Sequence, residues 1–204
     1  MIATIIEHMN AILSGMPYFS ENYGICELKP NGKNVIQPVQ YINGKWSAIP
    51  TNKYGLTYFR KASDVNIEAV ESFSQCDNDY ESTFNLRLFC MTKRSQFPND
   101  DAYSGDRLAA TILKGLAMTG GDLKRQIKAR HLSIRPSLYS TDTTSIINQE
   151  FSGLSISDFK HVDLVIALDV DVTIIQRQPC IDDACEYTPH FCLQLETKLA
   201  LPDA

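Results

Sequence analysis

The chain has 204 residues, of which 44% are hydrophobic and 21% charged, and its formal net charge at pH 7 is −5. This composition is that of an ordinary globular protein of one domain, or one domain plus an extension, and it excludes a disordered or fibrous chain. The negative charge argues against a nucleic-acid binder that neutralises phosphates, although it allows a protein that surrounds nucleic acid without gripping it.

Targeting and membrane segments are not expected. The apolar stretch from Met1 to Leu13 lacks a basic region and is interrupted by Glu7 and His8. The longest apolar run, Leu164 to Leu168, is far too short for a bilayer span. Six cysteines in a chain without a secretory signal predict free thiols and synthesis in the cytoplasm.

The first predicted element is an amphipathic helix over Ile2–Ser14. Apolar residues recur there at spacings of three and four, which places them on one helix face. Gly15 is placed to end this helix, and Pro17 prevents its continuation.

A β-rich section follows. Asn31-Gly32 and Asn43-Gly44 are hairpin signals, because the turn they favour needs positive φ at both central residues. Pro38 predicts that the strand between these two turns is an edge strand or is bulged. The expected strands are Tyr23–Lys29, Val35–Ile42, Lys45–Ile49, Leu56–Arg60, Val65–Val70 and Phe84–Met91.

A second helix is predicted near Asp106–Met118, after an acidic loop whose charge suits the N-terminus of a helix dipole. Its apolar stripe is regular, and Gly120-Gly121 ends it. A basic segment, Lys124–Arg135, follows. Weaker strands are expected near His131–Tyr139 and Ser145–Phe151.

The clearest pattern is the alternation from Val162 to Ile174. Every even position is apolar, whereas Asp163, Asp169 and Asp171 stand at odd positions. Strict period-two alternation predicts a strand with one buried face. Such a strand would be roughly 41–44 Å long, about the diameter of a compact chain of this length. It would therefore cross the whole domain, or leave it to pair with a neighbour.

The periodicity ends at Pro179. We therefore predict an α+β domain over residues 1–178 and a C-terminal extension over residues 179–204, whose apolar side chains need a neighbouring subunit to cover. Cysteine and histidine recur in this extension, at Cys180, Cys185, His190 and Cys192. Their spacing does not match the short paired knuckles of structural zinc, so unliganded thiols are favoured and zinc is the alternative.

Two acids on one strand face, Asp169 and Asp171, are the arrangement with which magnesium-dependent transferases hold a metal. Such enzymes also need a phosphate-binding turn, and Gly120-Gly121 lacks the lysine and the spacing of a P-loop. A solvated sheet face is therefore the favoured interpretation. Without a GxSxG motif or a plausible Cys/His constellation, we predict no catalytic, cofactor-binding or metal-binding residues.

One basic cluster stands out in the sequence, at Lys124, Arg125, Lys128, Arg130 and Arg135. The simplest interpretation is a solvated helix end. The functional alternatives are contact with the DNA backbone or with an acidic neighbouring subunit.

The order of the predicted elements is itself informative. A helix (Ile2–Ser14) precedes a β-meander, and a strand (Phe84–Met91) leads to a second helix (Asp106–Met118). A basic linker then precedes the long strand (Val162–Ile174). This layout, over roughly residues 1–176, resembles the tail terminator and tail-completion proteins of tailed bacteriophages, which form rings in the head–tail neck. The chain departs from them in its extra strands over Leu56–Val70 and in its extension.

The resemblance implies an α+β subunit with a mostly antiparallel sheet flanked by two helices, assembled into a six- or twelve-fold ring of the virion. Its partners would be neighbouring neck, portal or tail proteins and DNA that passes through the lumen without sequence-specific binding. No cofactor, membrane or enzymatic activity is expected. Asp163, Asp169 and Asp171 would face the lumen, and the basic cluster would meet a neighbouring protein. The alternative is a cytosolic α+β enzyme or ligand-binding domain without a recognisable motif.

Overall fold

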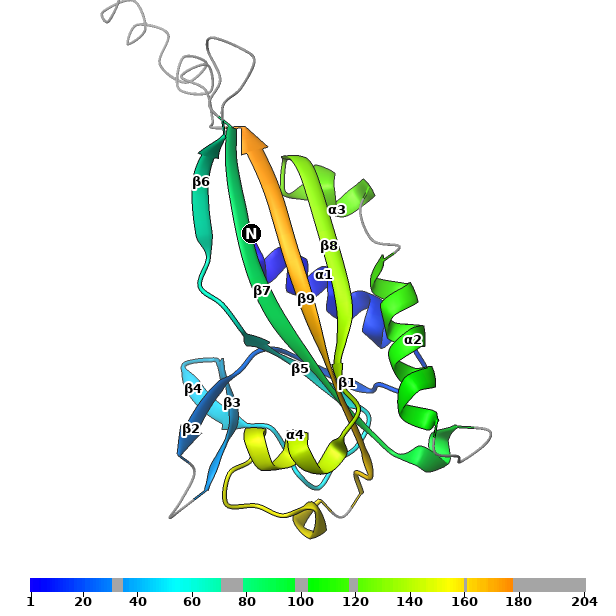
Figure 1. Ribbon diagram of the computed structural model, residues 1–204. Helices are drawn as coiled ribbons and strands as arrows, with labels where there is room; N and C mark the ends of the chain where they lie inside the picture. The colour runs from blue at the N-terminus through cyan, green and yellow to red at the C-terminus, as the bar shows by residue number, and fades with distance from the viewer. Residues whose placement is uncertain (31–34, 71–78, 98–102, 118–120, 160, 178–204) are drawn as a thin grey trace, which may run out of the picture.

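A computed structural model describes residues 1–30, 35–70, 79–97, 103–117, 121–159 and 161–177 (Figure 1). Its helices are α1 (Ile2–Ser14), α2 (Ser104–Ala117), α3 (Gly121–Gln126) and α4 (Thr143–Glu150), with short 3₁₀ turns η1 (Arg94–Gln96) and η2 (Ile156–Asp158). Its strands are β1 (Glu21–Ile25), β2 (Glu27–Pro30), β3 (Ile36–Ile42), β4 (Lys45–Ala48), β5 (Leu56–Lys61), β6 (Asn66–Val70), β7 (Asp79–Thr92), β8 (Ala129–Ser140) and β9 (Leu164–Arg177).

The main sheet has the strand order β1-β5-β7-β9-β8, and β6 lies beside β7 beyond the end of β5. Every pair in it is antiparallel except β1 with β5. β7 and β9 are 14 residues each and pair along their whole length, from Asp79 with Arg177 to Thr92 with Leu164. At ~3.3 Å per residue this ladder is roughly 46 Å long. The predicted α+β fold with a long C-terminal strand is confirmed.

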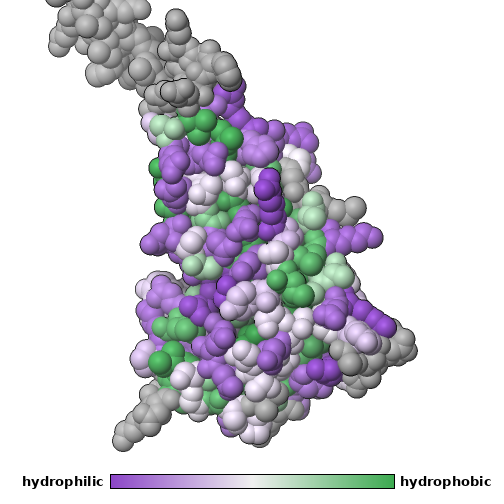
Figure 2. All heavy atoms as spheres, in the orientation of Figure 1, coloured by the Kyte–Doolittle hydropathy of each residue, from purple (hydrophilic) through white to green (hydrophobic). Residues whose placement is uncertain are grey.

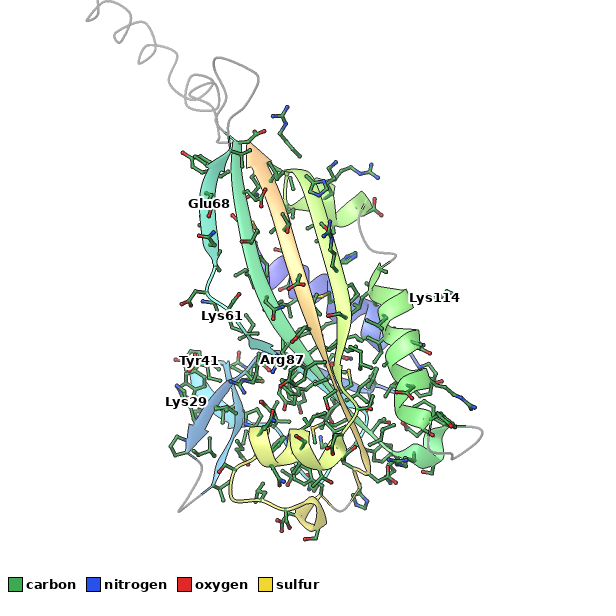
Figure 3. The ribbon with its side chains drawn as sticks, in the orientation of Figure 1. Lys29, Tyr41, Lys61, Glu68, Arg87 and Lys114 are labelled. Atoms are coloured by element: carbon green, nitrogen blue, oxygen red, sulfur yellow. The ribbon has the colours of Figure 1, made fainter. Side chains whose placement is uncertain are left out.

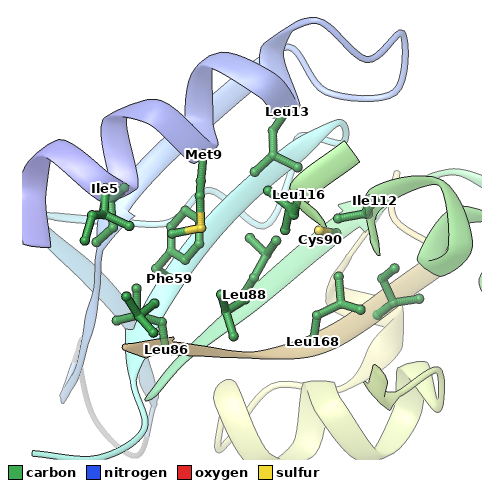
Figure 4. Close-up of a cluster of buried hydrophobic side chains, with 14 of the residues drawn as sticks. Ile5, Met9, Leu13, Phe59, Leu86, Leu88, Cys90, Ile112, Leu116 and Leu168 are labelled. Carbon is green, nitrogen blue, oxygen red and sulfur yellow. The ribbon is translucent and has the colours of Figure 1, made fainter. Parts of the chain in front are cut away.

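The register predicted for the long strand is also confirmed. The even-numbered residues of β9 from Leu164 to Ile174 are buried on the sheet face that α1 and α2 cover. Leu168 lies there with Leu88 of β7 and Ile112 of α2, and Met9 of α1 lies over Phe59 of β5 (Figure 4). The core between the sheet and these two helices is therefore formed by period-two strands and period-3.6 helices that turn their apolar sides to one another.

The opposite face of β9 is not uniformly solvated. Val165 and Ala167 stand at odd positions but are buried in a second cluster, with Tyr58, Phe89 and α4 (Figure 1). Only the half of the strand that begins at Asp169 has the predicted polar face. The part of the main sheet beside α4 is therefore apolar on both faces. The part beyond α4 is apolar only on the face that α1 and α2 cover.

The helix predictions were close for α1 and α2. α1 has the predicted bounds and buries Ile5, Ile6, Met9 and Leu13, while α2 begins slightly earlier than expected. A Cβ on Gly115 of α2 would lie 2.7 Å from Met16 Cε, so this glycine lets the end of α1 approach α2 closely.

A smaller sheet, with strand order β2-β3-β4, projects beside the main one (Figure 1). Asn43 and Gly44 have positive φ, as the predicted hairpin turn requires, while Asn31-Gly32 lies outside the described residues. The prediction for Pro38 was wrong, because β3 is the central strand. The Pro38 carbonyl accepts from the Ile49 N–H just past the end of β4. The Pro38 nitrogen faces the same side of β3, towards β4. Because the ladder between β3 and β4 ends at this position, the N–H donor that proline lacks costs little.

Two other sequence predictions need correction. The single strand expected at Tyr23–Lys29 is divided at Cys26, whose N–H donates to the Phe59 carbonyl, and its two parts belong to different sheets. The strand expected at Ser145–Phe151 is helix α4. There the Asp142 side chain caps the helix by accepting from the Ser145 N–H, and the buried residues recur at helical spacing. The β-branched isoleucines of this segment had favoured a strand.

The basic segment is not one element. α3, which the sequence analysis did not predict, contains Lys124 and Arg125, and β8 extends the strand expected at His131–Tyr139. β8 lies at the edge of the main sheet, where Pro136 is tolerated.

Candidate assembly site on the open sheet face

Beyond α4, none of the helices that the structure describes lies over one face of the main sheet (Figure 1). We call it the open sheet face. It consists of residues that the strand register places on one side of β6, β7, β9 and β8, namely Asn66, Glu68, Glu81, Thr83, Asn85, Arg87, Asp169, Asp171, Thr173, Ile175, His131, Ser133, Arg135 and Ser137. Four carboxylates and two guanidinium groups give it two net negative charges with histidine neutral. Figure 2 shows hydrophilic residues along most of it.

Asp169 is paired on this face with its cross-strand partner on β7, Arg87, which is labelled in Figure 3. The Arg87 Nε donates to Asp169 Oδ1 at 2.7 Å, and Nη2 donates to Oδ2 at 3.3 Å. The guanidinium carbon also lies 3.4 Å from the centre of the Tyr139 ring on β8. Both charged side chains are only 26% exposed, so Asp169 is part of a half-buried ion pair and contributes little free negative charge.

Asp171 is the more open acid of the pair. Its Oδ1 accepts a hydrogen bond from the Asn85 Nδ2 at 2.5 Å, and its residue is exposed. Arg135 stands opposite it on β8 and donates through Nε to the Ser133 hydroxyl at 3.2 Å. An asparagine and an arginine thus border this carboxylate, so both aspartates of the open sheet face have an arginine as a cross-strand neighbour.

Asp163 does not join the other two predicted acids. It precedes β9 at the opposite end of the ladder, where its own N–H donates to the Thr92 carbonyl at 3.3 Å. Its Oδ1 accepts from the Arg94 backbone N–H at 2.7 Å, which caps the turn η1. The structure therefore gives Asp163 a local role and brings only Asp169 and Asp171 together.

The predicted basic cluster is spread over three places. Lys124 and Arg125 are exposed on α3, and Arg125 pairs with Asp122 of the same helix at 2.8 Å. Lys128 lies in the turn before β8 with a φ of 51°. Arg130 donates to the buried Asp79 of β7 at 2.5 Å. Lys124 and Arg125 are therefore at a solvated helix end, as the simplest interpretation expected, whereas Lys128, Arg130 and Arg135 lie beside or on the β8 edge.

A buried polar group that no sequence signal indicated lies between β5 and α4. Glu150 is 4% exposed, and its Oε1 accepts from the Arg60 Nη1 at 2.5 Å. Burial raises the pKa of Glu150, although Arg60 opposes this shift. Glu150 Oε2 and the fully buried Tyr58 hydroxyl have no hydrogen bond of good geometry, yet Tyr58 is close enough to lower the Glu150 pKa slightly. The sequence analysis could not place Glu150 beside Arg60, because it predicted a strand where the structure has helix α4.

This group is not arranged for nucleophilic chemistry. Burial raises the pKa of the neighbouring Cys26 thiol to about 12 and that of Cys90 further, so both are protonated at neutral pH. Both are free, as predicted, while Cys76 and the cysteines of the extension lie outside the described residues. The arrangement can hold α4 on the sheet but cannot supply a thiolate.

The two borders of the open sheet face are both available. Among the described residues, no strand pairs with the outer edge of β6 or of β8. Large apolar side chains accompany these edges, with Ile67 of β6 62% exposed and Leu138 of β8 45% exposed. Free edges of this kind offer rows of backbone N–H and C=O groups to another chain.

A second apolar surface lies on the small sheet. Tyr41 and Trp46 are cross-strand partners with ring centres 5.0 Å apart, and the Lys29 Nζ lies 3.2 Å from the centre of the Trp46 ring. Tyr41 and Lys29 appear together at the outer side of this sheet in Figure 3. The patch is separate from the open sheet face.

Depressions suited to a small ligand are modest. One of about 400 Å³ contains Glu21 and Lys53, which pair with each other at 2.5 Å, and His161. Another, of about 470 Å³, lies between α1 and β1 and contains Asn10. The described part of the chain contains no group of three His, Cys, Asp or Glu residues that could hold a metal ion. The cysteine-rich set considered for zinc lies outside it.

Comparison with known proteins gives no family. No family model matches the chain, and no curated protein matches it either. Within the described residues, no helix is both long enough and apolar enough to cross a membrane.

Proposed function

We propose that this chain is a structural virion protein that forms a ring in the head–tail neck or tail of a tailed bacteriophage, as a connector, tail terminator or ring protein around the DNA channel. The observation that carries the proposal is the open sheet face, on each border of which the described part of the chain has a strand with an unpaired outer edge. The proposed ring protein acts through its shape and its charge, and it is not an enzyme.

Free edges on both sides of one sheet support assembly. A strand edge exposed to water is a liability that proteins usually cover, shorten or twist away. β8 has 12 residues, a long edge to leave unpaired. Two different edges on one subunit allow a heterologous contact, and repeated heterologous contacts close into a ring when the rotation between copies divides a full turn.

The charge of the open sheet face supports a lumen. Because its net charge is negative, six or twelve copies facing inward would repel DNA phosphates and let the genome slide. Asp171, Glu68 and Glu81 are the acids that supply this field, since Asp169 is neutralised by Arg87. Asp163, at the far end of the ladder, would lie near the mouth of such a channel.

The competing proposal is a cytosolic α+β enzyme or ligand-binding domain. The depression beside α1 favours it, because the Asn10 Oδ1 in this region is buried without a hydrogen-bond partner, as a ligand-recognising amide would be. Its apolar lining, with Ile2, Ile6 and Ile25, fits a small apolar ligand. Fewer observations support an enzyme or ligand-binding domain than support a ring subunit.

Mass in solution separates the two proposals. Multi-angle light scattering of the purified chain, followed by negative-stain microscopy, should give six or twelve times the 22.9 kDa of the monomer and particles with a central hole. A monomer or compact dimer at every soluble concentration would contradict the ring and favour the competing proposal.

Genome passage tests the charge of the lumen. Changing Asp163, Asp169 and Asp171 together to lysine should spare ring assembly but slow or trap DNA ejection. Asp171→Lys alone is the cleanest variant, because the other two carboxylates also hold local structure. Loss of assembly with normal passage in the remaining rings would instead place these acids at a subunit interface.

A further inference from the structure

β6 and β8 border the open sheet face on opposite sides and run in opposite directions. β6 is antiparallel to β7, β7 to β9, and β9 to β8. If one copy is rotated about an axis roughly parallel to the strands and set beside another, β8 of the first meets β6 of the second. Because the two strands are then antiparallel, they can form the ordinary ladder of N–H···O=C bonds.

The two edges also stand at the same level of the sheet. On the open sheet face, the register joins Glu68 of β6 to Glu81, then to Ile175, and then to His131 of β8. No large slide along the strand direction is needed to bring β6 of one copy against the beginning of β8 of the next.

One apolar residue of β6 is largely exposed on the helix side of the sheet. Ile67 lies on the helix side of the sheet, in register with the buried Ser82, yet its side chain is 62% exposed. On the same side of the sheet and at the same level, Leu132 of β8 packs against the hydrophobic core. Leu123 of α3 belongs to this core. α3 lies beside the upper part of β8 in Figure 1. A neighbour that brings its β8 against β6 therefore brings its α3 towards Ile67.

The charges of the two edges are complementary. Glu68 and Glu81 are direct cross-strand partners, a like-charge pair that is unfavourable in an isolated subunit. Glu68 stands on the outermost strand, on the far side of the sheet from β8 (Figure 3). The β8 edge carries Arg135, and α3 adds Lys124, while Arg130 is already paired with Asp79 of its own subunit. A basic edge placed beside an acidic one gains attraction and a defined register.

We propose that β8 of one copy pairs edge to edge with β6 of the next copy, with the neighbour's α3 covering Ile67, so that the open sheet faces of successive copies join into one continuous sheet surface. This contact rests on the proposed ring and specifies how its subunits meet. It assigns Lys124 and Arg135 of the basic cluster to the subunit interface and leaves Asp171 and Glu81 on the continuous surface.

Two exposed-edge variants test the contact. Ile67→Asp introduces a charge on the β6 edge, and the double variant His131→Glu with Arg135→Glu reverses the charge of the β8 edge. Each full-length variant alone should lose all species above the monomer in light scattering. Mixed in equal amounts, they should form a heterodimer of twice the 22.9 kDa monomer and nothing larger, because each retains one good edge that fits the other. Glu68→Lys provides a second β6 variant, which should weaken assembly in the same direction.

The matched control is Ile42→Asp, an equivalent change at the exposed last residue of β3 in the small sheet, which should assemble like the unmodified chain. Circular dichroism verifies that every variant is folded. An assembled unmodified chain with an equally assembled Ile67→Asp variant would overturn the edge contact and leave the ring intact. So would a mixture that forms larger species, or a β6 variant that remains a dimer through β8 alone. An unmodified chain that is monomeric at every soluble concentration would overturn both the contact and the ring.

Discussion

Leu168→Asp is the sharpest test of the sheet, because it puts a carboxyl group into the core between β9 and the helices. Leu168 is fully buried opposite Leu88 of β7. Losing a buried leucine costs about 2–5 kcal/mol. The least costly state of the new carboxyl group is the protonated one, and protonating a group of pKa about 3.9 at pH 7 costs roughly 4 kcal/mol. Together these are roughly 6–9 kcal/mol, comparable with the whole stability of a domain at about 5–15 kcal/mol.

Urea unfolding followed by far-UV circular dichroism at two pH values measures this effect. We expect Leu168→Asp to be largely unfolded at pH 7 and to regain about 3 kcal/mol relative to the unmodified chain at pH 4.5, because protonation then costs less. The matched control is Thr173→Asp, on the same strand but on the open sheet face, where a change below about 1 kcal/mol is expected. A stable Leu168→Asp beside an unfolded Thr173→Asp would mean that the two faces of β9 are assigned the wrong way round.

Three further predictions address other parts of the structure. Arg87→Ala removes the ion pair with Asp169 and the ring contact with Tyr139, and should cost about 1–2 kcal/mol in urea unfolding, less at 1 M salt; a loss independent of salt would argue against an electrostatic origin. Burial raises the pKa of Glu150 above the ordinary 4.5, so the folded chain holds this proton more tightly, and its contribution to stability is lost as pH rises through that raised value. Glu150→Gln should remove this part of the slope of melting temperature against pH, and an unchanged slope would contradict the shift. Truncation before Pro179 should leave a folded subunit that fails to join the particle, whereas unfolding of the shortened chain would show that the extension belongs to its own core.

The sequence predicted those elements whose periodicity is long and has one buried face. α1 and the even-numbered face of β9 follow directly from apolar spacing, because one row of side chains decides the element. The strand predicted at Phe84–Met91 was right in face but short, since β7 begins at Asp79. The first residues of β7 are mostly polar and show no apolar alternation. They form a strand because they pair with β9.

Errors arose where tertiary contacts override local pattern. α4 contains two adjacent isoleucines that favour a strand, and only the Asp142 cap and the second apolar cluster make it a helix. The site was predictable in part. Alternation placed Asp169 and Asp171 on one face, but a single sequence could not show that Arg87 neutralises the first. That pairing depends on a register between residues 82 positions apart.

The central position of β9 has a consequence for the order of events during synthesis. β7 and β8 do not pair with each other, and both wait for the strand that is translated last of the three. At ~5–20 residues per second, β9 leaves the ribosome roughly 2–8 seconds after β8. During that interval β7 lacks the strand with which it pairs along its whole length, and contacts between residues far apart in the sequence form slowly. A subunit therefore becomes competent to meet its neighbours only once β9 has been inserted, which delays contacts between chains growing on adjacent ribosomes until each sheet is complete.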